Sequence, residues 1–357
     1  MHRRNFIQTS VLSTIGSVLG IRHMAWGQNS GTGLVFDAMG EIRTVYTPEL
    51  VEQILASGTR AITITLTDPK ITGDKGFHQL MEDLAVYDEY FQANPKQFVK
   101  AFSIGDIDRA VKERKLAVFY LIQNADPVEK DLGRVDTLYS LGLRSVQLTY
   151  NDQNYVGHGC YERNDGGLSD FGMQLIDKLN RKNILVDLSH AGMKTMSDAI
   201  TASRKPVIIS HSTCKTLYKH ARNTTDENLK LLADKGGVIG MCQIRIFMTQ
   251  KKTDNLDVYF DHIDHAVKVA GIEHVAIGSD RDHRVIPDTE EEKRILFKEE
   301  GAQFTADKDW PLYLEKLNGP RRMEIVRDGL VKRKYTEDQI GKIMGGNLYR
   351  LYKEVIG

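Results

Sequence analysis

The sequence predicts an α/β fold, a (βα)8 TIM barrel with insertions at its rim and extra helices at the C-terminus. Short apolar runs rich in β-branched residues alternate with segments of helical periodicity, and eight such runs can be counted. Most of these runs are continuously apolar, which is typical of parallel strands covered on both faces. A barrel of this kind needs about 250 residues or more, so a chain of 357 residues is long enough. A doubly wound open sheet is the alternative arrangement.

The predicted elements follow one another in order. We expect strands at 34–36, 60–66, 116–122, 145–149, 184–188, 207–210, 237–241 and 275–277. We expect helices at 48–57, 78–93, 106–113, 135–141, 169–180, 194–202, 226–233 and 256–270. Asp106 and Ser169 are suited to helix N-caps, and Gly142 and Gly271 to helix ends. The long segment between the second and third strands and the charged stretch 281–308 are expected as insertions at the catalytic rim.

Composition excludes several classes of protein. Lys plus Arg equals Asp plus Glu at 48 each, so the formal net charge is zero. A general nucleic-acid binder carries a basic excess, and we therefore expect no nucleic-acid partner. No apolar run reaches the roughly 18–20 residues that a membrane-spanning helix needs. No glycine-rich nucleotide motif follows a predicted strand.

The first residues resemble a twin-arginine export signal. Arg3 and Arg4 precede Phe6-Ile7 and a mildly apolar run, and the small-x-small pattern Ala25-Trp26-Gly27 follows. We therefore expect residues 1–27 to be a signal peptide and residues 28–357 to form a single domain. The export machinery would be a partner, and the mature protein would be periplasmic or otherwise exported. The three cysteines show no C-x-x-C spacing, so a cysteine-based zinc site is not expected.

The catalytic residues of a (βα)8 barrel lie at the carboxyl ends of its strands. His190 and His211 follow two consecutive predicted strands, and Asp280 follows the last one. Imidazole is the commonest ligand of zinc-like metals, and a neighbouring carboxylate can take the proton of an attacking water. Arg222, eleven residues after His211, could hold a substrate carboxylate through both arms of its guanidinium; a structural ion pair is the alternative.

Several segments then resemble the membrane dipeptidase (renal dipeptidase) family of zinc metallopeptidases. In the order of that family they are 141–149 (LGLRSVQLT), 167–172 (GLSDFG), 186–190 (VDLSH), 209–212 (ISHS), Arg222-Asn223, 277–280 (IGSD) and 345–350 (GGNLYR). The resemblance implies a binuclear zinc site that hydrolyses dipeptides. By motif, His190 and His211 match two zinc ligands, Arg222 the residue that holds the substrate carboxylate, and Asp280 the proton-handling acid.

Three positions depart from this pattern. The His-x-Asp pair expected after the first strand is Met39-Gly40-Glu41, the bridging glutamate is Gln123, and the histidine after the fourth strand is Tyr150. A thioether and a neutral amide are poor replacements for such ligands. We therefore expect one divalent metal, Zn²⁺ by preference, on His190 and His211 with help from Asp280, while Gln123 and Glu41 are further candidate ligands. The segments 151–154 and 159–163 resemble a bacterial subgroup of the family, so the departures fit a subgroup pattern.

The sequence therefore predicts an exported metal-dependent hydrolase that cleaves an amide bond in a small carboxylate-bearing substrate such as a dipeptide. Asp280 and Tyr150 are the catalytic candidates, with Tyr150 donating a hydrogen bond to the oxyanion. Arg222, Tyr150 and Asn151 are the candidates for substrate binding. A lyase, isomerase or other hydrolase of a non-peptide metabolite and a non-catalytic binding or maturation protein are the alternatives. A homodimer is left open.

Overall fold

The computed structural model describes residues 33–300 and 305–357, so the predicted signal peptide lies outside the described residues. Its parallel sheet runs in the order β2-β1-β9-β8-β7-β6-β5-β4, and β2 also pairs with β4. This pairing closes eight strands into a barrel, which confirms the predicted fold. The strands are β1 Val35–Gly40, β2 Thr59–Thr65, β3 Phe98–Lys100, β4 Leu116–Ile122, β5 Leu143–Gln147, β6 Leu185–Asp187, β7 Ile208–Ser212, β8 Val238–Met241 and β9 Val275–Ile277.

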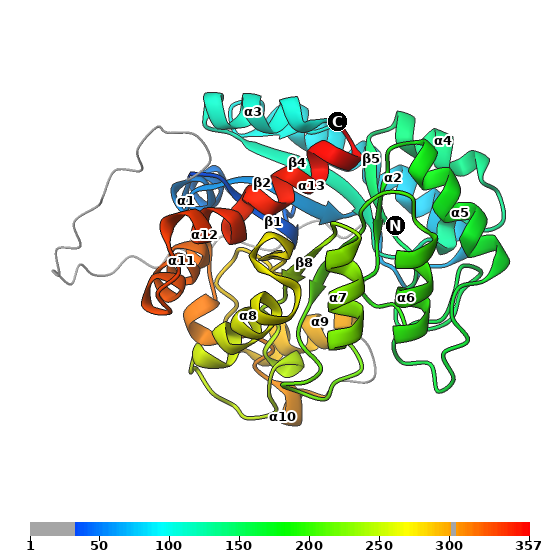
Figure 1. Cartoon of the computed structure of the whole chain (residues 1–357). Coiled ribbons are helices and arrows are strands. Elements are labelled where there is room, and N and C mark those ends of the chain that lie inside the picture. The colour runs from blue at the N-terminus through cyan, green and yellow to red at the C-terminus, as the bar shows by residue number, and fades with distance from the viewer. Residues whose placement is uncertain (1–32, 301–304) are drawn as a thin grey trace, which may run out of the picture.

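The helices surround the barrel (Figure 1). They are α1 Pro48–Ala56, α2 Gly73–Ala93, α3 Ile104–Glu113, α4 Gly133–Ser140, α5 Asp170–Arg181, α6 Met193–Ala202, α7 Asp226–Asp234, α8 Asp257–Ala270, α9 Glu290–Glu300, α10 Ala306–Asp309, α11 Arg322–Lys332, α12 Glu337–Gly341 and α13 Asn347–Val355. Ser169 caps α5 by accepting a hydrogen bond from Gly172 N, as predicted. Asp106 instead lies inside α3, where it completes a capping box with the N-cap Ser103.

One strand was not predicted. The long segment between β2 and β4 contains β3, which pairs with the first three residues of β4. The expectation that this whole segment is a rim insertion was therefore wrong. Its second half lies at the amino-terminal end of the barrel, because β3 runs parallel to β4 beside the start of that strand.

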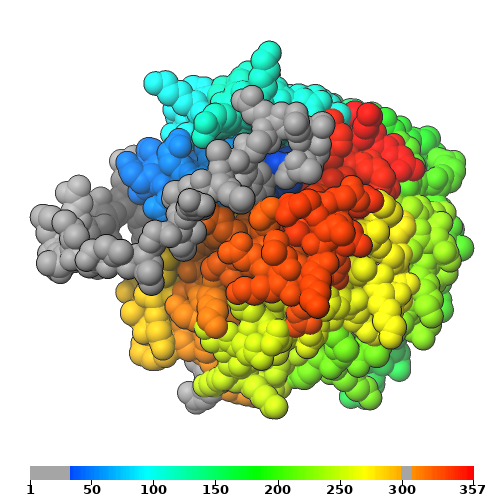
Figure 2. Space-filling view, turned by 60° about the vertical axis from the view of Figure 1, so that its left-hand side comes forward, coloured from blue at the N-terminus to red at the C-terminus, as the bar shows by residue number. Residues whose placement is uncertain are grey.

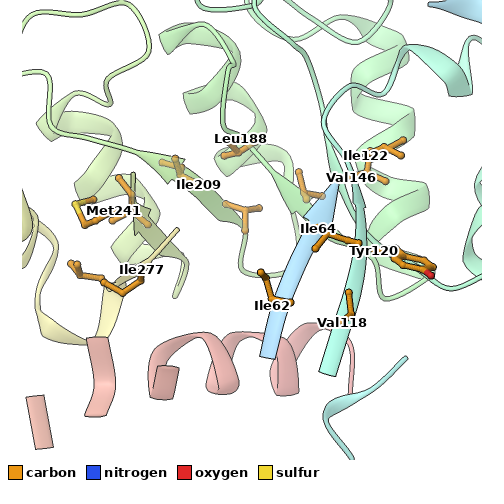
Figure 3. Packing of buried hydrophobic residues seen from close by; sticks show 14 of the residues in the cluster. Ile62, Ile64, Val118, Tyr120, Ile122, Val146, Leu188, Ile209, Met241 and Ile277 are labelled. Carbon is orange, nitrogen blue, oxygen red and sulfur yellow. The ribbon is translucent and has the colours of Figure 1, made fainter. Parts of the chain in front are cut away.

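Two hydrophobic clusters hold the barrel together. The larger one joins the outward-facing strand residues to the helices, and Figure 3 shows part of it around Ile62, Ile64, Val118 and Tyr120. The smaller one includes Phe36, Phe119 and residues of α13 such as Tyr352, whose hydroxyl lies 2.6 Å from Thr63 Oγ1. These clusters leave the carboxyl end of the barrel to the polar residues described below.

Extra helices follow the barrel at the C-terminus, as predicted, and α11 lies beside α8. Arg333, which follows α11, forms ion pairs at 2.7 Å with Asp257, Asp261 and Asp264 of α8. Figure 2 shows the red C-terminal segment beside the yellow one on this surface. In the described part of the chain, no helix is long and apolar enough to cross a bilayer.

Candidate active site

A cavity of about 400 Å³ lies at the carboxyl ends of the strands. Residues predicted from the sequence to lie at the rim form much of its wall, namely Met39, Glu41, Gln123, Tyr150, His190 and Asp280. They come from β1 and from the loops after β1, β4, β5, β6 and β9. The barrel thus brings residues that are far apart in the sequence to one place.

His190 and His211 face each other in this region. His211 lies in β7 and is fully buried, while His190 follows β6 and is 7% exposed. Their Nε2 atoms are 3.0 Å apart. His190 has a φ of +61°, a left-handed conformation that non-glycine residues rarely adopt, and such strain is concentrated at functional sites.

The hydrogen bonds behind the two rings determine their tautomers. His190 Nδ1 lies 2.7 Å from Asn151 Oδ1, an acceptor, so this nitrogen carries the proton. His211 Nδ1 lies 2.8 Å from Ser210 Oγ, whose own proton goes to Asp187 Oδ2 at 2.5 Å. His211 Nδ1 is therefore also protonated, and both Nε2 atoms present lone pairs to each other.

This arrangement fits a single cation. Burial, together with the nearby Arg222 guanidinium, holds the pKa of His190 and of His211 well below the ordinary value, so both rings are neutral. Two facing lone pairs repel unless a cation lies between them. Two imidazole nitrogens at about 2.0–2.1 Å from a tetrahedral Zn²⁺ would lie roughly 3.3 Å apart, which is close to the separation in this site.

The structure does not bring Asp280 to these histidines as a preformed third ligand. Among the described residues, no three or more His, Cys, Asp or Glu side chains gather as a metal-binding group. Asp280 N donates to Met39 O at 2.8 Å, which holds the residue at the β1 side of the cavity. The help of Asp280 in holding the metal stays a prediction.

Asp280 is suited to proton transfer. Burial raises its pKa to about 6, and the Glu41 carboxylate adds to this increase although Arg222 opposes it. Its φ is +55°, so the backbone here is also in the left-handed region. A carboxylate with such a pKa can take and release a proton near neutral pH.

Arg222, Tyr150 and Asn151 surround the two histidines. Arg222 Nη2 donates to His211 O at 3.2 Å, and the Tyr150 ring stacks on His190 with 4.2 Å between centroids. Asn151 binds His190 directly, so it positions this ring; contact of Asn151 with the substrate stays a prediction. Cys160 Sγ lies 3.6 Å from the same Asn151 oxygen. Sequence reasoning missed the polar residues that hydrogen-bond to the Nδ1 side of the two imidazole rings. A polar residue within an apolar strand, such as Asp187, is a signal that could have found them.

Met39, Glu41 and Gln123, which come from β1 and from the loops after β1 and β4, do not fit a second metal. Glu41 Oε2 is 2.6 Å from Arg43 Nε, so its charge is already paired. Met39 and Gln123 line the cavity, but they offer only a thioether and a neutral amide. These donors bind zinc-like cations weakly.

Comparisons with known proteins identify the family of this chain. Residues 58–291 match the sequence model of the membrane dipeptidase family, peptidase family M19. The chain belongs to this family. An uncharacterized dipeptidase of Schizosaccharomyces pombe is 37% identical over 174 residues, which cover 47% of this chain and 42% of that protein. The chain thus matches less than half of that relative's length.

Solved structures share the fold. An amidohydrolase from Pseudomonas aeruginosa is 29% identical, with a TM-score of 0.76 over 92% of this chain and 98% of the other. A metallo peptidase from Rhodobacter sphaeroides, solved with a phosphinate mimic of the dipeptide L-Ala-D-Ala, has a TM-score of 0.76 at 17% identity and covers 90% of this chain and 99% of the other. At that identity the second likeness shows the fold alone.

The membrane dipeptidase resemblance places a bridging glutamate at Gln123, which gives a direct test. Gln123→Glu should tighten binding of the first divalent cation by roughly tenfold, because a carboxylate adds negative charge beside the histidines. The measurement is a competition titration with Zn²⁺. Asn124→Asp is the control, since it adds the same charge at a neighbour whose amide bonds Pro69 O. Equal affinity in wild type and Gln123→Glu would show that residue 123 is not at a bridging position.

Proposed function

We propose that this membrane dipeptidase family member hydrolyses an amide bond in a dipeptide or a similarly small, carboxylate-bearing substrate, and that it uses one divalent cation, preferably Zn²⁺. The observation that carries this proposal is the pair of imidazole Nε2 atoms that lie 3.0 Å apart, with the Nδ1 atom of each ring hydrogen-bonded behind it. A carboxylate with a raised pKa lines the same cavity as His190.

His190 and His211 would hold the cation. When bound, a divalent cation polarises a carbonyl group and makes water more acidic. Asp280 takes the proton of the attacking water and delivers it to the leaving amine as the C–N bond breaks. The Arg222 guanidinium binds the substrate carboxylate, and the Tyr150 hydroxyl donates a hydrogen bond to the oxyanion.

The test combines metal content and turnover. Purified protein is dialysed against chelator and titrated with Zn²⁺, and hydrolysis of a panel of dipeptides and small amides is then followed by amine release. We expect one equivalent of metal and turnover only in its presence. Binding of two equivalents would contradict the single-cation assignment, and absence of both metal and turnover would favour a non-catalytic protein.

We also propose that the segment 1–27 directs export through the twin-arginine route, which the Arg3-Arg4 pair supports. Changing both arginines to lysine should leave the precursor in the cytoplasm. Fractionation and immunoblotting of the two forms measures this, with Arg22→Lys as the matched control. Normal export of the double variant would exclude the twin-arginine route.

A further inference from the structure

Five arginines of the described residues are at most 7% exposed, namely Arg144, Arg222, Arg245, Arg281 and Arg322. A guanidinium stays charged in proteins and presents five N–H donors. Arg144, Arg245 and Arg322 each donate at least three hydrogen bonds. Arg222 and Arg281 differ from these three because they make fewer hydrogen bonds, and each has at least one enclosed guanidinium nitrogen without a hydrogen-bond partner.

Arg281, directly after Asp280, has the fewest partners of the five. Its Nε and Nη2 atoms are enclosed with no hydrogen-bond partner, and its guanidinium lies 4.6 Å over the ring of Tyr313. A buried guanidinium whose N–H donors lack hydrogen-bond partners is costly to maintain in a folded protein. Such a group is therefore expected where a ligand of opposite charge completes the site.

The carboxylates nearest to Arg281 already have other partners. Glu41 is paired with Arg43, and Asp282 accepts hydrogen bonds from Arg284 N at 2.8 Å and from Arg284 Nε at 2.7 Å. Neither is an ion-pair partner of Arg281 within 4.0 Å among the residues that the structure describes. Both carboxylates still act on Arg281 through the electrostatic field, but the enclosed Nε and Nη2 donors of Arg281 have no hydrogen-bond acceptor.

Arg222 has the same kind of environment. Its Nε is enclosed without a partner, and its guanidinium lies 5.2 Å over Phe247, which lines the cavity. Phe247 and Tyr313 belong to one hydrophobic cluster, so both guanidinium groups lie over aromatic rings of that cluster. Asp280 is within electrostatic reach of both arginines, and Glu41 and Asp282 also act on Arg281, but the enclosed Nε groups of both arginines stay without an acceptor.

We propose that Arg281 binds an acidic group of the substrate, so that the preferred substrate carries a second carboxylate in addition to the one at Arg222. This inference rests on the proposed function. An acidic dipeptide, with an Asp or Glu side chain, has this chemistry. A planar guanidinium stacked on a ring is well suited to a carboxylate, because it can donate two parallel hydrogen bonds.

The test compares substrates that differ by one charge and little in size. kcat/KM is measured for Gly-Glu and Gly-Gln and for Glu-Gly and Gln-Gly. In at least one pair, wild type should prefer the acidic member by about tenfold to a hundredfold, the range expected for a charge-assisted hydrogen bond. Arg281→Gln should bring that ratio close to one, mainly through KM. The ratio is internal to each variant, so incomplete folding cancels.

Arg284→Gln is the matched control, since it removes the same charge three residues away and should keep the preference. Arg281→Lys retains the positive charge but not the planar guanidinium, so this variant should keep part of the preference for the acidic dipeptide. An unchanged ratio in Arg281→Gln, or a wild type that favours both neutral dipeptides, would overturn the proposal.

A binding measurement separates this proposal from the proposed function. Calorimetry uses reduced-amide analogues of the same dipeptides, in which CH2–NH replaces the scissile amide. If no dipeptide is hydrolysed but the acidic analogue still binds more tightly in an Arg281-dependent way, the hydrolase assignment fails and the acidic specificity stands. If dipeptides are hydrolysed without any such preference in rate or binding, the acidic specificity fails alone.

Discussion

Replacing either His190 or His211 by Ala is expected to weaken binding of the divalent cation by at least a hundredfold and to abolish hydrolysis. Each variant removes one of two facing lone pairs, and a single imidazole is a weak site. Equilibrium dialysis with metal analysis gives the affinity. The fold should persist, because both side chains lie at the carboxyl ends of strands while the hydrophobic clusters lie elsewhere.

His274→Ala is the control for this experiment. His274 precedes β9 at the opposite end of the barrel, where its Nδ1 bonds Gly237 O at 2.7 Å. This variant should keep wild-type metal affinity. Full metal occupancy in the His190→Ala/His211→Ala double variant would mean that the cation binds elsewhere.

The barrel could be predicted from the sequence because its strands are covered on both faces, and such strands appear in the sequence as continuously apolar runs. The exceptions have physical reasons. β3 spans only three residues and pairs only with β4, so it leaves little signal. β1 was predicted to end at residue 36, but it continues through Asp37 to Gly40. Asp37 stays in the barrel because it accepts hydrogen bonds from Ser279 N and Oγ.

The candidate site was predictable in its positions but not in its contacts. Strand ends indicated His190, His211 and Asp280 because a parallel barrel aligns all carboxyl ends. The proton on each imidazole, however, depends on Asn151 and Ser210. Ser210 directly precedes His211, but nothing local in the sequence pairs Asn151 with His190, which lies 39 residues further along the chain. Arg281 was likewise not singled out, since the lack of a partner in a buried guanidinium is a property of the folded chain.

Asp280→Asn is expected to lower kcat by about a hundredfold to ten-thousandfold, the usual contribution of a general base. The amide has the size of the carboxylate but cannot accept the proton of water. Asn also tolerates a left-handed backbone, so the φ of +55° at this position should be kept. Metal affinity should change only modestly, because Asp280 does not gather with the histidines as a ligand group.

Asp282→Asn distinguishes this role from a general loss of negative charge. Asp282 forms hydrogen bonds with Tyr46 and Arg284, and these contacts occupy its oxygens. Its amide variant should therefore retain kcat within a few-fold, although the loss of ion pairing with Arg43 and Arg284 should lower thermal stability. If Asp280→Asn turned over substrate at the wild-type rate, the base would have to be sought at Glu41 or Asp282. A fall in kcat without a matching fall in metal occupancy assigns the proton transfer to Asp280, because a ligand would lose both together.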